Sequence, residues 1–320
     1  MQIISNPTQN EIKKAAQALK DGHLVAFPTE TVYGLGADAT NENAVGRVYS
    51  VKARPIDHPL IVHISSINQL GKWAIDIPKY AIKLAEEFWP GPMTLILKRS
   101  EIAKDYITGS QENVGVRVPS HPVALALLSE FEKLGGLGMA APSANRFGKV
   151  SPTSSTDVQE DLGKYLEEVD QILDGGRSFV GIESTIINCL SDSPVVLRPG
   201  SISTGQIDRF IEAKKYLESK LVSVNAPGLL FAHYSPNAKV LTEGVPNIGD
   251  GFLALADIPT PSGAIRLASP ETVDQFAQVL YQSLRSADKN GIKRIFVSIP
   301  SGDGVAIAIR DRIQKASNSS

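Results

Sequence analysis

Residues 24–36 read LVAFPTETVYGLG and combine a short apolar run with a cluster of polar side chains. The apolar run, residues 24–27, has the length and composition of a buried strand. It is followed at once by hydroxyl and carboxylate groups and by two glycines, in the order Pro28, Thr29, Glu30, Thr31, Gly34 and Gly36. Because α/β folds bind ligands beyond the ends of their strands, this stretch predicts an α/β fold with a ligand pocket at the polar cluster.

Helices and strands are predicted to alternate on both sides of this stretch. The segment TQNEIKKAAQALKDG begins with a Thr-x-x-Glu capping box and ends at a glycine, which predicts a helix at about residues 9–21. Further apolar and amphipathic segments continue to about residue 200 without a break in composition. The chain has 320 residues, enough for two domains, and we predict the first domain at residues 1–203.

The pattern changes after residue 203. TGQIDRFIEAKKYLES predicts a helix, and APGLLFAHYSP, residues 226–236, is rich in proline but also carries aromatic side chains. A purely flexible linker lacks aromatic residues, so residues 204–239 are predicted to be a linker that packs against the first domain. Residues 240–320 are predicted to form a small α/β domain, read as strand, helix, strand and helix.

Composition limits the class of protein. Hydrophobic residues make up 42% of the chain and charged residues 21%, with a formal net charge of −2, which is typical of a soluble globular protein and argues against bulk attraction to nucleic acid. The single cysteine, Cys189, lies in an apolar stretch and is interpreted as a buried, inert thiol in a reducing compartment. We find no signal-peptide pattern and no run of roughly 18 apolar residues, so we expect a cytoplasmic protein without membrane contact.

Several enzyme classes lack their motifs in this sequence. There is no G-x-x-x-x-G-K-[ST], no G-x-S-x-G, no H-E-x-x-H and no Cys/His cluster. GLGADA and GLGMAA both match the loose dinucleotide fingerprint G-x-G-x-x-[GA]. A dinucleotide site needs these glycines between a strand and a helix, with an acidic residue about 20 positions later. Neither segment has this arrangement, which disfavours a dehydrogenase.

Further polar clusters lie near the ends of apolar runs. Lys52 and Arg54 are separated by one residue and precede a proline, so in an extended segment both side chains can point at one polyanion. The alternative is that both charges are simply solvated at the surface. Arg117 lies inside the apolar strand VGVRVP and needs an anionic partner, either a carboxylate of the protein or one of a substrate. Two more stretches, APSANRFGKVSPTS and VGIESTIINC, contribute Ser143, Asn145, Ser151, Glu183, Ser184 and Thr185. Each cluster alone could be an ordinary turn, but five in one domain favour a binding site.

Seven motifs together resemble the YrdC family of L-threonylcarbamoyladenylate synthases. They occur in the order FPTETVYGLGADA, KARPIDHPLIVHI, WPGPMTLIL, VGVRVPSHP, APSANRFGKVSPT, GIESTI and VLRPGSIS. APGLLFAHYSP and the C-terminal segment resemble the longer, two-domain form of that family. The resemblance implies a twisted mixed-sheet domain with a concave ligand pocket, a linker folded over the active site and a small Rossmann-like α/β domain. One departure is Ala53, where many members carry a glycine between the two basic residues.

The resemblance also implies a reaction. A nucleotidyltransferase would convert L-threonine, bicarbonate and ATP, the last with Mg²⁺, to threonylcarbamoyl-AMP, pyrophosphate and water. The product would pass to the tRNA threonylcarbamoyl transferase machinery that modifies adenosine 37. Such chemistry needs positioning and charge neutralisation more than a protein nucleophile, which agrees with the missing catalytic triad.

Site residues follow by matching positions to the family motifs. For L-threonine these are Arg117 at the carboxylate, His63 at the hydroxyl, and Thr31 and Ser184 at the amine or carbamate. For ATP they are Lys52, Arg54, His58, Ser143, Ser151, Arg198 and Tyr234. Lys52 and Arg54 would hold phosphates and be the catalytic pair, and Tyr234 would close over the nucleotide as a lid. Glu30 is either a structural hydrogen-bond acceptor or helps to place Mg²⁺.

Two other classes of protein remain as alternatives. A nucleic-acid-binding module is disfavoured by the net charge of −2 and the lack of basic runs, so no tight direct tRNA binding is expected. A transferase that uses carbamoyl phosphate is suggested by hydrogenase-maturation proteins, which contain a YrdC-like domain. Those proteins also carry zinc-finger-like cysteine pairs, which a chain with one cysteine cannot form.

Overall fold

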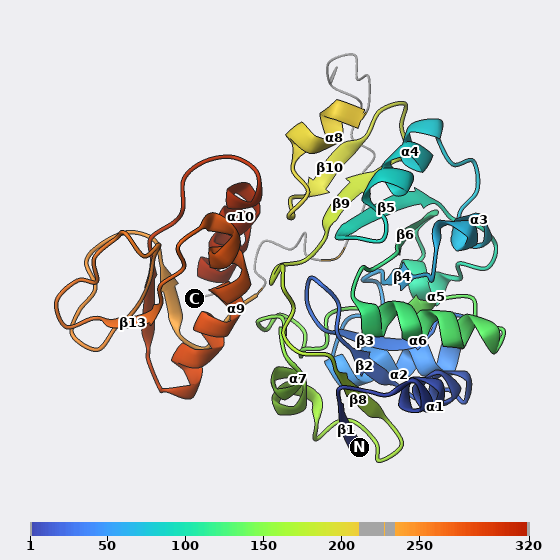
Figure 1. Ribbon diagram of the computed structural model, residues 1–320, viewed down its shortest axis with the longest axis horizontal. Helices are drawn as coiled ribbons and strands as arrows, with labels where there is room; N and C mark the ends of the chain where they lie inside the picture. Colours follow the sequence, from blue (N-terminus) through green and yellow to red (C-terminus); the bar gives the residue numbers. More distant parts are fainter. Residues whose placement is uncertain (1, 211–226, 228–233, 319–320) are drawn as a thin grey trace.

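The computed structural model describes residues 2–210, 227 and 234–318. Within this part, the chain forms a larger α/β domain up to residue 210 and a smaller one from residue 239 onward (Figure 1). Each domain has its own sheet, one of ten strands and one of four. The predicted combination of a mixed-sheet domain with a small α/β domain is confirmed.

The larger sheet is mixed, with strand order β1-β8-β2-β3-β7-β4-β6-β5-β9-β10. Its central part joins parallel and antiparallel neighbours, since β4 pairs with β6 in parallel and with β7 antiparallel. The strands are β1 (Gln2–Ser5), β2 (Val25–Phe27), β3 (Gly34–Asp38), β4 (Ile61–His63), β5 (Met93–Lys98), β6 (Asn113–Arg117), β7 (Met139–Ala140), β8 (Gln171–Asp174), β9 (Thr185–Asn188) and β10 (Val195–Arg198).

Helices cover this sheet. They are α1 (Gln9–Lys20), α2 (Glu42–Lys52), η1 (Ile67–Gln69), α3 (Leu70–Trp73), α4 (Lys79–Phe88), α5 (Asp105–Thr108), α6 (Pro122–Lys133), α7 (Ser155–Leu162) and α8 (Thr204–Phe210). The capping box of α1 is present, because Glu11 Oε2 accepts from Thr8 N at 2.7 Å while Thr8 Oγ1 accepts from Glu11 N. The helix predicted from residue 204 starts there, and its continuation beyond Phe210 lies outside the described residues.

Alternation along β2 and the residue before it explains why both faces of this strand are buried. Val25 and Phe27 belong to the core under α1 and α6, whereas Leu24 and Ala26 belong to the core under α2 and α4. Successive side chains of a strand point to opposite faces of the sheet, so both faces of the sheet are buried at β2. Close packing favours the glycines that follow it, since a Cβ would lie 3.2 Å from the Phe27 ring at Gly34 and 3.0 Å from it at Gly36.

The smaller domain has an all-parallel sheet in the order β11-β14-β12-β13. Its elements are β11 (Lys239–Leu241), β12 (Gly251–Leu253), β13 (Ile265–Ala268), α9 (Val273–Lys289), β14 (Arg294–Val297) and α10 (Val305–Ser317). The sequence predicted β12, α9, β14 and α10 but missed β11 and β13. Both missed strands are short edge strands with partly exposed side chains, so neither gives a clear apolar run.

Helices α9 and α10 lie between the small sheet and the larger domain (Figure 1). Along this seam, Arg285 of α9 forms two hydrogen bonds to Asp161 of α7, at 3.0 and 2.6 Å. One turn further along, Lys289 pairs with Glu160 at 2.7 Å. The second domain is therefore docked on the first through opposite charges as well as through a buried network described below.

Two predictions from composition can be compared with the structure. Cys189 is buried, and burial raises the pKa of its thiol, as expected for an inert cysteine. In the part of the chain that the structure describes, none of the helices has the length and apolar character needed to span a membrane.

Candidate active site

A pocket lies where the polar loop after β2 meets the carboxyl ends of β4, β6 and β10. It is lined by Thr29, Thr31, Val32, Tyr33, Gly34, Arg54, Ile61, His63, Arg117, Ala141, Pro142, Ser143, Glu183, Ser184, Arg198, Pro227 and Tyr234. All four residues predicted for L-threonine are in this lining. Of the residues predicted for ATP, Arg54, Ser143, Arg198 and Tyr234 line it, whereas Lys52, His58 and Ser151 do not.

Arg117 has an anionic partner inside the protein. Its Nη2 lies 2.7 Å from Glu30 Oε1, and both side chains are buried. Its Nη1 donates to Thr31 Oγ1 at 3.0 Å, and its Nε to the Gly91 carbonyl oxygen at 3.3 Å. The sequence left two anionic partners open for Arg117, a carboxylate of the protein and one of a substrate. The structure shows the protein carboxylate, so the guanidinium is paired without a substrate.

Glu30 is a structural acceptor in this conformation. Besides its ion pair with Arg117, its Oε2 accepts a hydrogen bond from Ser120 N at 3.1 Å. The carboxylate thus ties the loop after β2 to the loop after β6. Both of its oxygens have partners, which favours the first of the two roles considered for Glu30.

His63 places an imidazole in the pocket with its ring edge against Phe27, at 5.9 Å between ring centroids. Its Nδ1 is buried and accepts or donates no hydrogen bond within the described part of the chain, so a ligand hydroxyl could bind there. Burial, and then the nearby Arg117, lower the pKa of His63 to about 3. The imidazole is therefore neutral at physiological pH.

This depressed pKa predicts a pH-dependent stability. An unfolded histidine titrates near 6.5, so between pH 6.5 and about 3 the unfolded chain binds a proton at His63 that the folded protein does not. The free energy of unfolding should fall with decreasing pH in this window, by up to about 1.4 kcal/mol per pH unit from this group. Urea unfolding of the wild type and of His63→Gln between pH 7 and pH 5 measures it. Equal pH slopes for the two proteins would contradict the assignment.

Arg198 and Ser184 form one unit on the other side of the pocket. Arg198 donates to the Ser184 carbonyl oxygen from Nε (3.1 Å) and Nη2 (2.9 Å), and from Nη2 to Ser184 Oγ at 3.2 Å. Its Nη1 donates to the Pro227 carbonyl oxygen at 2.8 Å. All of these acceptors are neutral. Burial lowers the pKa of Arg198, and the nearby Glu183 carboxylate opposes this effect without forming an ion pair within 4.0 Å among the described residues.

Arg54 is a second buried cation with neutral partners. It donates to the carbonyl oxygens of Pro59 (2.9 Å) and His58 (3.4 Å), and its guanidinium lies 5.7 Å from the centre of the Phe147 ring. Among the residues that the structure describes, no carboxylate lies within 4.0 Å of it. Burial lowers the pKa of Arg54 to about 10. A buried cation of this kind is costly unless an anion binds beside it.

Lys52 is not brought into the pocket. Its ammonium donates to the backbone carbonyl oxygens of Ser143 and Asn145, two residues of the loop after β7. The side chain is wholly buried, and burial lowers the pKa of the amine well below its usual value. In this conformation Lys52 anchors the loop that presents Ser143, so its expected contact with phosphate stays a prediction. Asn145, whose Oδ1 accepts from Ser143 Oγ at 2.6 Å, belongs to the same unit.

Two other predicted ATP residues lie beside the pocket. His58 is half-buried and packs edge-on against Phe147, next to Arg54. Ser151 is buried, and its Oγ donates to Glu183 Oε1 at 2.6 Å. Ser151 therefore positions a carboxylate that lines the pocket, and contact of either residue with ATP stays a prediction.

The comparisons with known proteins agree with this geometry. A family model described as Telomere recombination, covering the Sua5, YciO and YrdC proteins, matches residues 17–200. The chain belongs to the Sua5/YciO/YrdC family. A second model, described as Threonylcarbamoyl-AMP synthase, C-terminal domain, matches residues 202–318. The predicted family is thus confirmed, and both matches together span nearly the whole chain.

Individual relatives of this Sua5/YciO/YrdC protein are similar along their full length. The threonylcarbamoyl-AMP synthase of Pyrococcus abyssi is 39% identical, over 96% of this chain and 94% of its own. That of Bacillus subtilis is also 39% identical, over 96% and 92%. A crystal structure of P. abyssi Sua5 complexed with L-threonine matches with a TM-score of 0.88 at 36% identity, covering 100% of this chain and 98% of that one.

Tyr234 closes the pocket of this family member from the side of the second domain. It is buried, with a ring stacked on Tyr281 of α9 at 5.7 Å between centroids. With Pro227 it leaves a cavity of only ≈ 60 Å³, far below the roughly 300–1,000 Å³ of typical ligand pockets. The rest of the predicted lid, including His233, lies outside the described residues. Between the described residues, the cavity in this conformation is thus smaller than a typical ligand pocket.

Sequence reasoning missed Tyr281 and Arg312, and it treated Glu183 only as part of a polar cluster. Glu183 lines the pocket, and its carboxylate accepts from Tyr281 OH (2.8 Å) and from Arg312 Nε (2.7 Å) as well as from Ser151. Burial alone would raise the pKa of Glu183, but the charges of Arg312 and Arg198 outweigh it and lower the pKa to about 2. This carboxylate is ionised and fully engaged.

Proposed function

We propose that this protein is a nucleotidyltransferase that converts L-threonine, bicarbonate and ATP to L-threonylcarbamoyl-AMP, pyrophosphate and water. Relatives named threonylcarbamoyl-AMP synthase cover 96% of the chain, and a Sua5 structure with the same fold holds L-threonine. The pocket has two chemically different sides. One carries a paired guanidinium, a hydroxyl and a neutral imidazole. The other carries Arg54 and Arg198, whose hydrogen bonds in the described residues go to neutral oxygens.

The observation that carries this proposal is the set of buried cations with neutral partners. Arg54 and Arg198 line the pocket, and Lys52 lies beneath the loop of Ser143. In the described residues their hydrogen bonds go only to carbonyl and hydroxyl oxygens. The two guanidinium groups are costly to bury without a bound anion, because the carboxylates at the pocket, Glu30 and Glu183, are already ion-paired with Arg117 and Arg312. A triphosphate supplies several negative charges, and guanidinium groups bind phosphate oxygens with good geometry.

The reaction follows from these two sides. The amine of L-threonine takes up CO2 derived from bicarbonate, and an oxygen of the resulting carbamate attacks the α-phosphorus of ATP. The bond from that phosphorus to the pyrophosphate oxygen breaks as the new bond forms, so pyrophosphate leaves. Thr31, His63, Arg117 and Ser184 would orient the carbamate, while Arg54 and Arg198 would neutralise the charge that moves onto pyrophosphate.

Mg²⁺ is proposed to enter as part of the ATP substrate. Among the described residues there is no group of three His, Cys, Asp or Glu side chains that could hold a metal. The two carboxylates at the pocket, Glu30 and Glu183, are each paired with an arginine. Mg²⁺ commonly binds through substrate phosphates and water with few protein ligands, and there it would neutralise phosphate charge.

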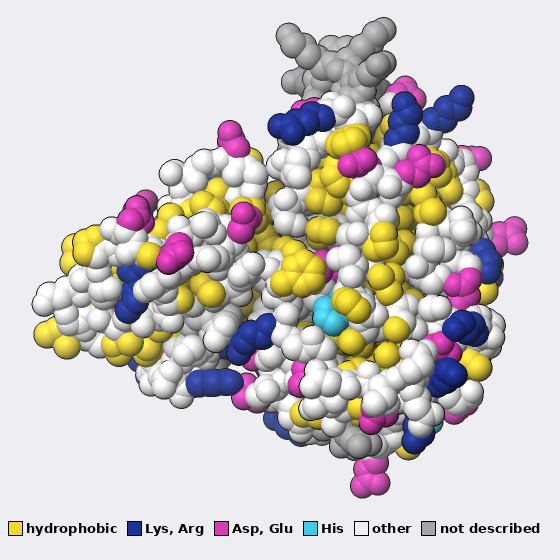
Figure 2. All heavy atoms as spheres, viewed as in Figure 1, with side chains coloured by type: hydrophobic (Ala, Val, Ile, Leu, Met, Phe, Trp, Pro, Cys, Tyr) yellow, Lys and Arg dark blue, Asp and Glu magenta, His cyan; other side chains and the backbone are white. Residues whose placement is uncertain are grey.

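The product carries a reactive mixed anhydride, so it must pass to an acceptor before water destroys it. We propose that the tRNA threonylcarbamoyl transferase machinery consumes it, in the cytoplasm. On the face shown in Figure 2, Lys and Arg side chains alternate with Asp and Glu side chains over both domains. Such mixed charge, with a net charge of −2, supports the prediction that the protein does not bind tRNA tightly by itself.

The proposal predicts pyrophosphate release that depends on all three substrates together. Purified protein with Mg²⁺ should release pyrophosphate with ATP, L-threonine and bicarbonate, and at less than a tenth of that rate when L-threonine or bicarbonate is omitted. Carbamoyl phosphate in place of bicarbonate tests the alternative carbamoyl donor. Release independent of threonine, or faster release with carbamoyl phosphate, would overturn the proposal.

A further inference from the structure

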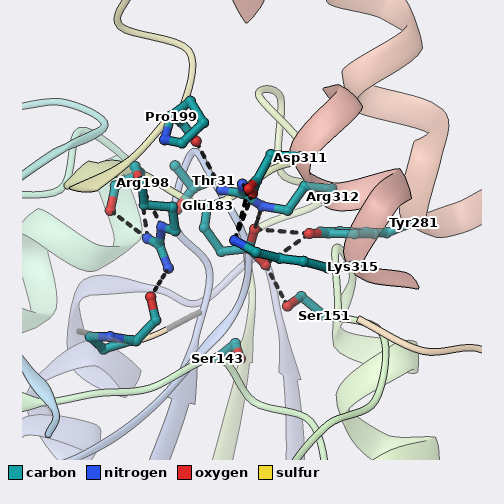
Figure 3. A network of polar contacts seen from close by, with 12 residues as sticks. Thr31, Ser143, Ser151, Glu183, Arg198, Pro199, Tyr281, Asp311, Arg312 and Lys315 are labelled. Carbon is teal, nitrogen blue, oxygen red and sulfur yellow. Dashed lines mark hydrogen bonds and ion pairs between the residues drawn. The ribbon is translucent and has the colours of Figure 1, made fainter. Parts of the chain in front are cut away.

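Arg312 of α10 is a buried arginine from the second domain that reaches the first. Its Nε donates to Glu183 Oε2 at 2.7 Å, and its side chain has no exposed surface. Figure 3 shows Arg312 and Tyr281 extending from the second domain toward Glu183, with Arg198 and Pro199 on the opposite side. Arg312 also has an acidic neighbour on its own helix, Asp311, which pairs with its Nη1.

Each contact that Arg312 makes across the seam reaches a residue of the pocket or its immediate neighbour. Glu183 lines the pocket and precedes Ser184. The Pro199 carbonyl oxygen, which accepts from Arg312 Nη2 at 3.1 Å, directly follows Arg198. The guanidinium also lies 5.2 Å from the centre of the Tyr234 ring. The Arg312 side chain therefore contacts Glu183, Pro199 and Tyr234, which lie at the same side of the pocket.

The Arg117 part of the predicted L-threonine site is supported differently, whereas Ser184 shares the wall of Arg198. Arg117 is held by Glu30, Thr31 and Gly91, all within the first domain. Thr31 Oγ1 is also within 2.8 Å of Thr29 Oγ1. Arg312 contacts none of these residues in the hydrogen bonds and ion pairs of the described chain. Its influence should thus fall on the side of Arg198 and Tyr234.

We propose that Arg312 is a positioning residue through which the docked second domain sets the geometry of the ATP side of the pocket. The assignment of that side to ATP rests on the proposed function. A lysine at this position would keep the charge beside Glu183 but could not reproduce the second donor to Pro199 or the planar group beside Tyr234. A residue that only balanced the charge of Glu183 would tolerate lysine.

The experiment compares Arg312→Lys with the matched control Arg310→Lys on the same helix. Among the described residues, Arg310 donates hydrogen bonds only to the carbonyl oxygens of Pro300 and Gly302, within the second domain. For Arg312→Lys we expect the KM for ATP to rise at least fivefold, and the calorimetric Kd for L-threonine to stay within twofold of wild type. Arg310→Lys should change neither value. An unchanged KM for ATP in Arg312→Lys overturns the proposal.

A second variant guards against a folding defect. Replacing a buried ion pair by neutral groups of similar size is often tolerated, so Glu183→Gln combined with Arg312→Met should fold and melt cooperatively. It should still show a raised KM for ATP, because the contacts to Pro199 and Tyr234 are lost. Wild-type ATP affinity in this pair variant would contradict the positioning role. If wild type itself makes no adenylate, the proposed function fails, and the Kd for ATP measured by calorimetry on the same variants decides this inference separately.

Discussion

Replacing Arg54 with alanine is expected to lower the kcat/KM for pyrophosphate release by roughly 100-fold, while the protein remains folded. Arg54 lines the pocket and is buried, and within the described part of the chain it contacts carbonyl oxygens and an aromatic ring but no carboxylate within 4.0 Å. Removing one charge-assisted contact to a phosphate should cost on the order of 2–4 kcal/mol in the transition state. The rate is measured with saturating L-threonine and bicarbonate and varied ATP.

The stability of Arg54→Ala gives this prediction a second readout. An uncompensated buried cation destabilises the free protein, so its removal should leave the melting temperature unchanged or raise it. Arg99→Ala is the control, because Arg99 pairs with Asp105 and Glu112 at the surface, where such pairs contribute little, and it should retain activity. Activity of Arg54→Ala within threefold of wild type would rule out a role at the phosphates.

Glu30→Ala is expected to lower the free energy of unfolding by about 3–5 kcal/mol. The change removes the carboxylate 2.7 Å from Arg117 Nη2 and the acceptor for Ser120 N. It would leave a buried guanidinium with only hydroxyl and carbonyl partners. Urea unfolding at pH 7 measures the loss.

A paired variant and a ligand test this explanation of Glu30. Glu30→Ala combined with Arg117→Met removes both charges and should recover at least half of the lost stability. L-threonine should stabilise Glu30→Ala more than wild type if its carboxylate binds Arg117. A loss below about 1 kcal/mol for the single variant would mean that the buried pair is solvated.

The sequence predicted most of the larger domain because its signals are local. The capping box at Thr8 and the two-face strand at residues 24–27 depend on neighbours within a few positions. The strands β11 and β13 were missed because only pairing with β14 and β12 identifies them. Their side chains are partly exposed, so no hydrophobic pattern marks them.

The role of a site residue was predictable where its neighbours in the sequence limit what it can do. Arg117 in an apolar strand required an anion, although the sequence could not decide between Glu30 and a substrate. The direction of Lys52 was not predictable, since its ammonium binds carbonyl oxygens of a loop more than ninety residues away in sequence. Arg312 was missed because a charged residue in an amphipathic helix ordinarily indicates a solvent-facing position, and only the docking of the two domains buries it.

Mass analysis with ¹³C-bicarbonate tests the central proposal, that the pocket joins a threonine-derived carbamate to AMP, most directly. The protein is incubated with Mg²⁺, ATP, L-threonine and ¹³C-bicarbonate, and nucleotide products are analysed at once, because the anhydride is labile. The proposal predicts an adenylate with the mass of threonylcarbamoyl-AMP plus one ¹³C, formed in step with pyrophosphate and absent without L-threonine. AMP or ADP as the only nucleotide product, or a threonyl adenylate without the ¹³C label, would contradict it.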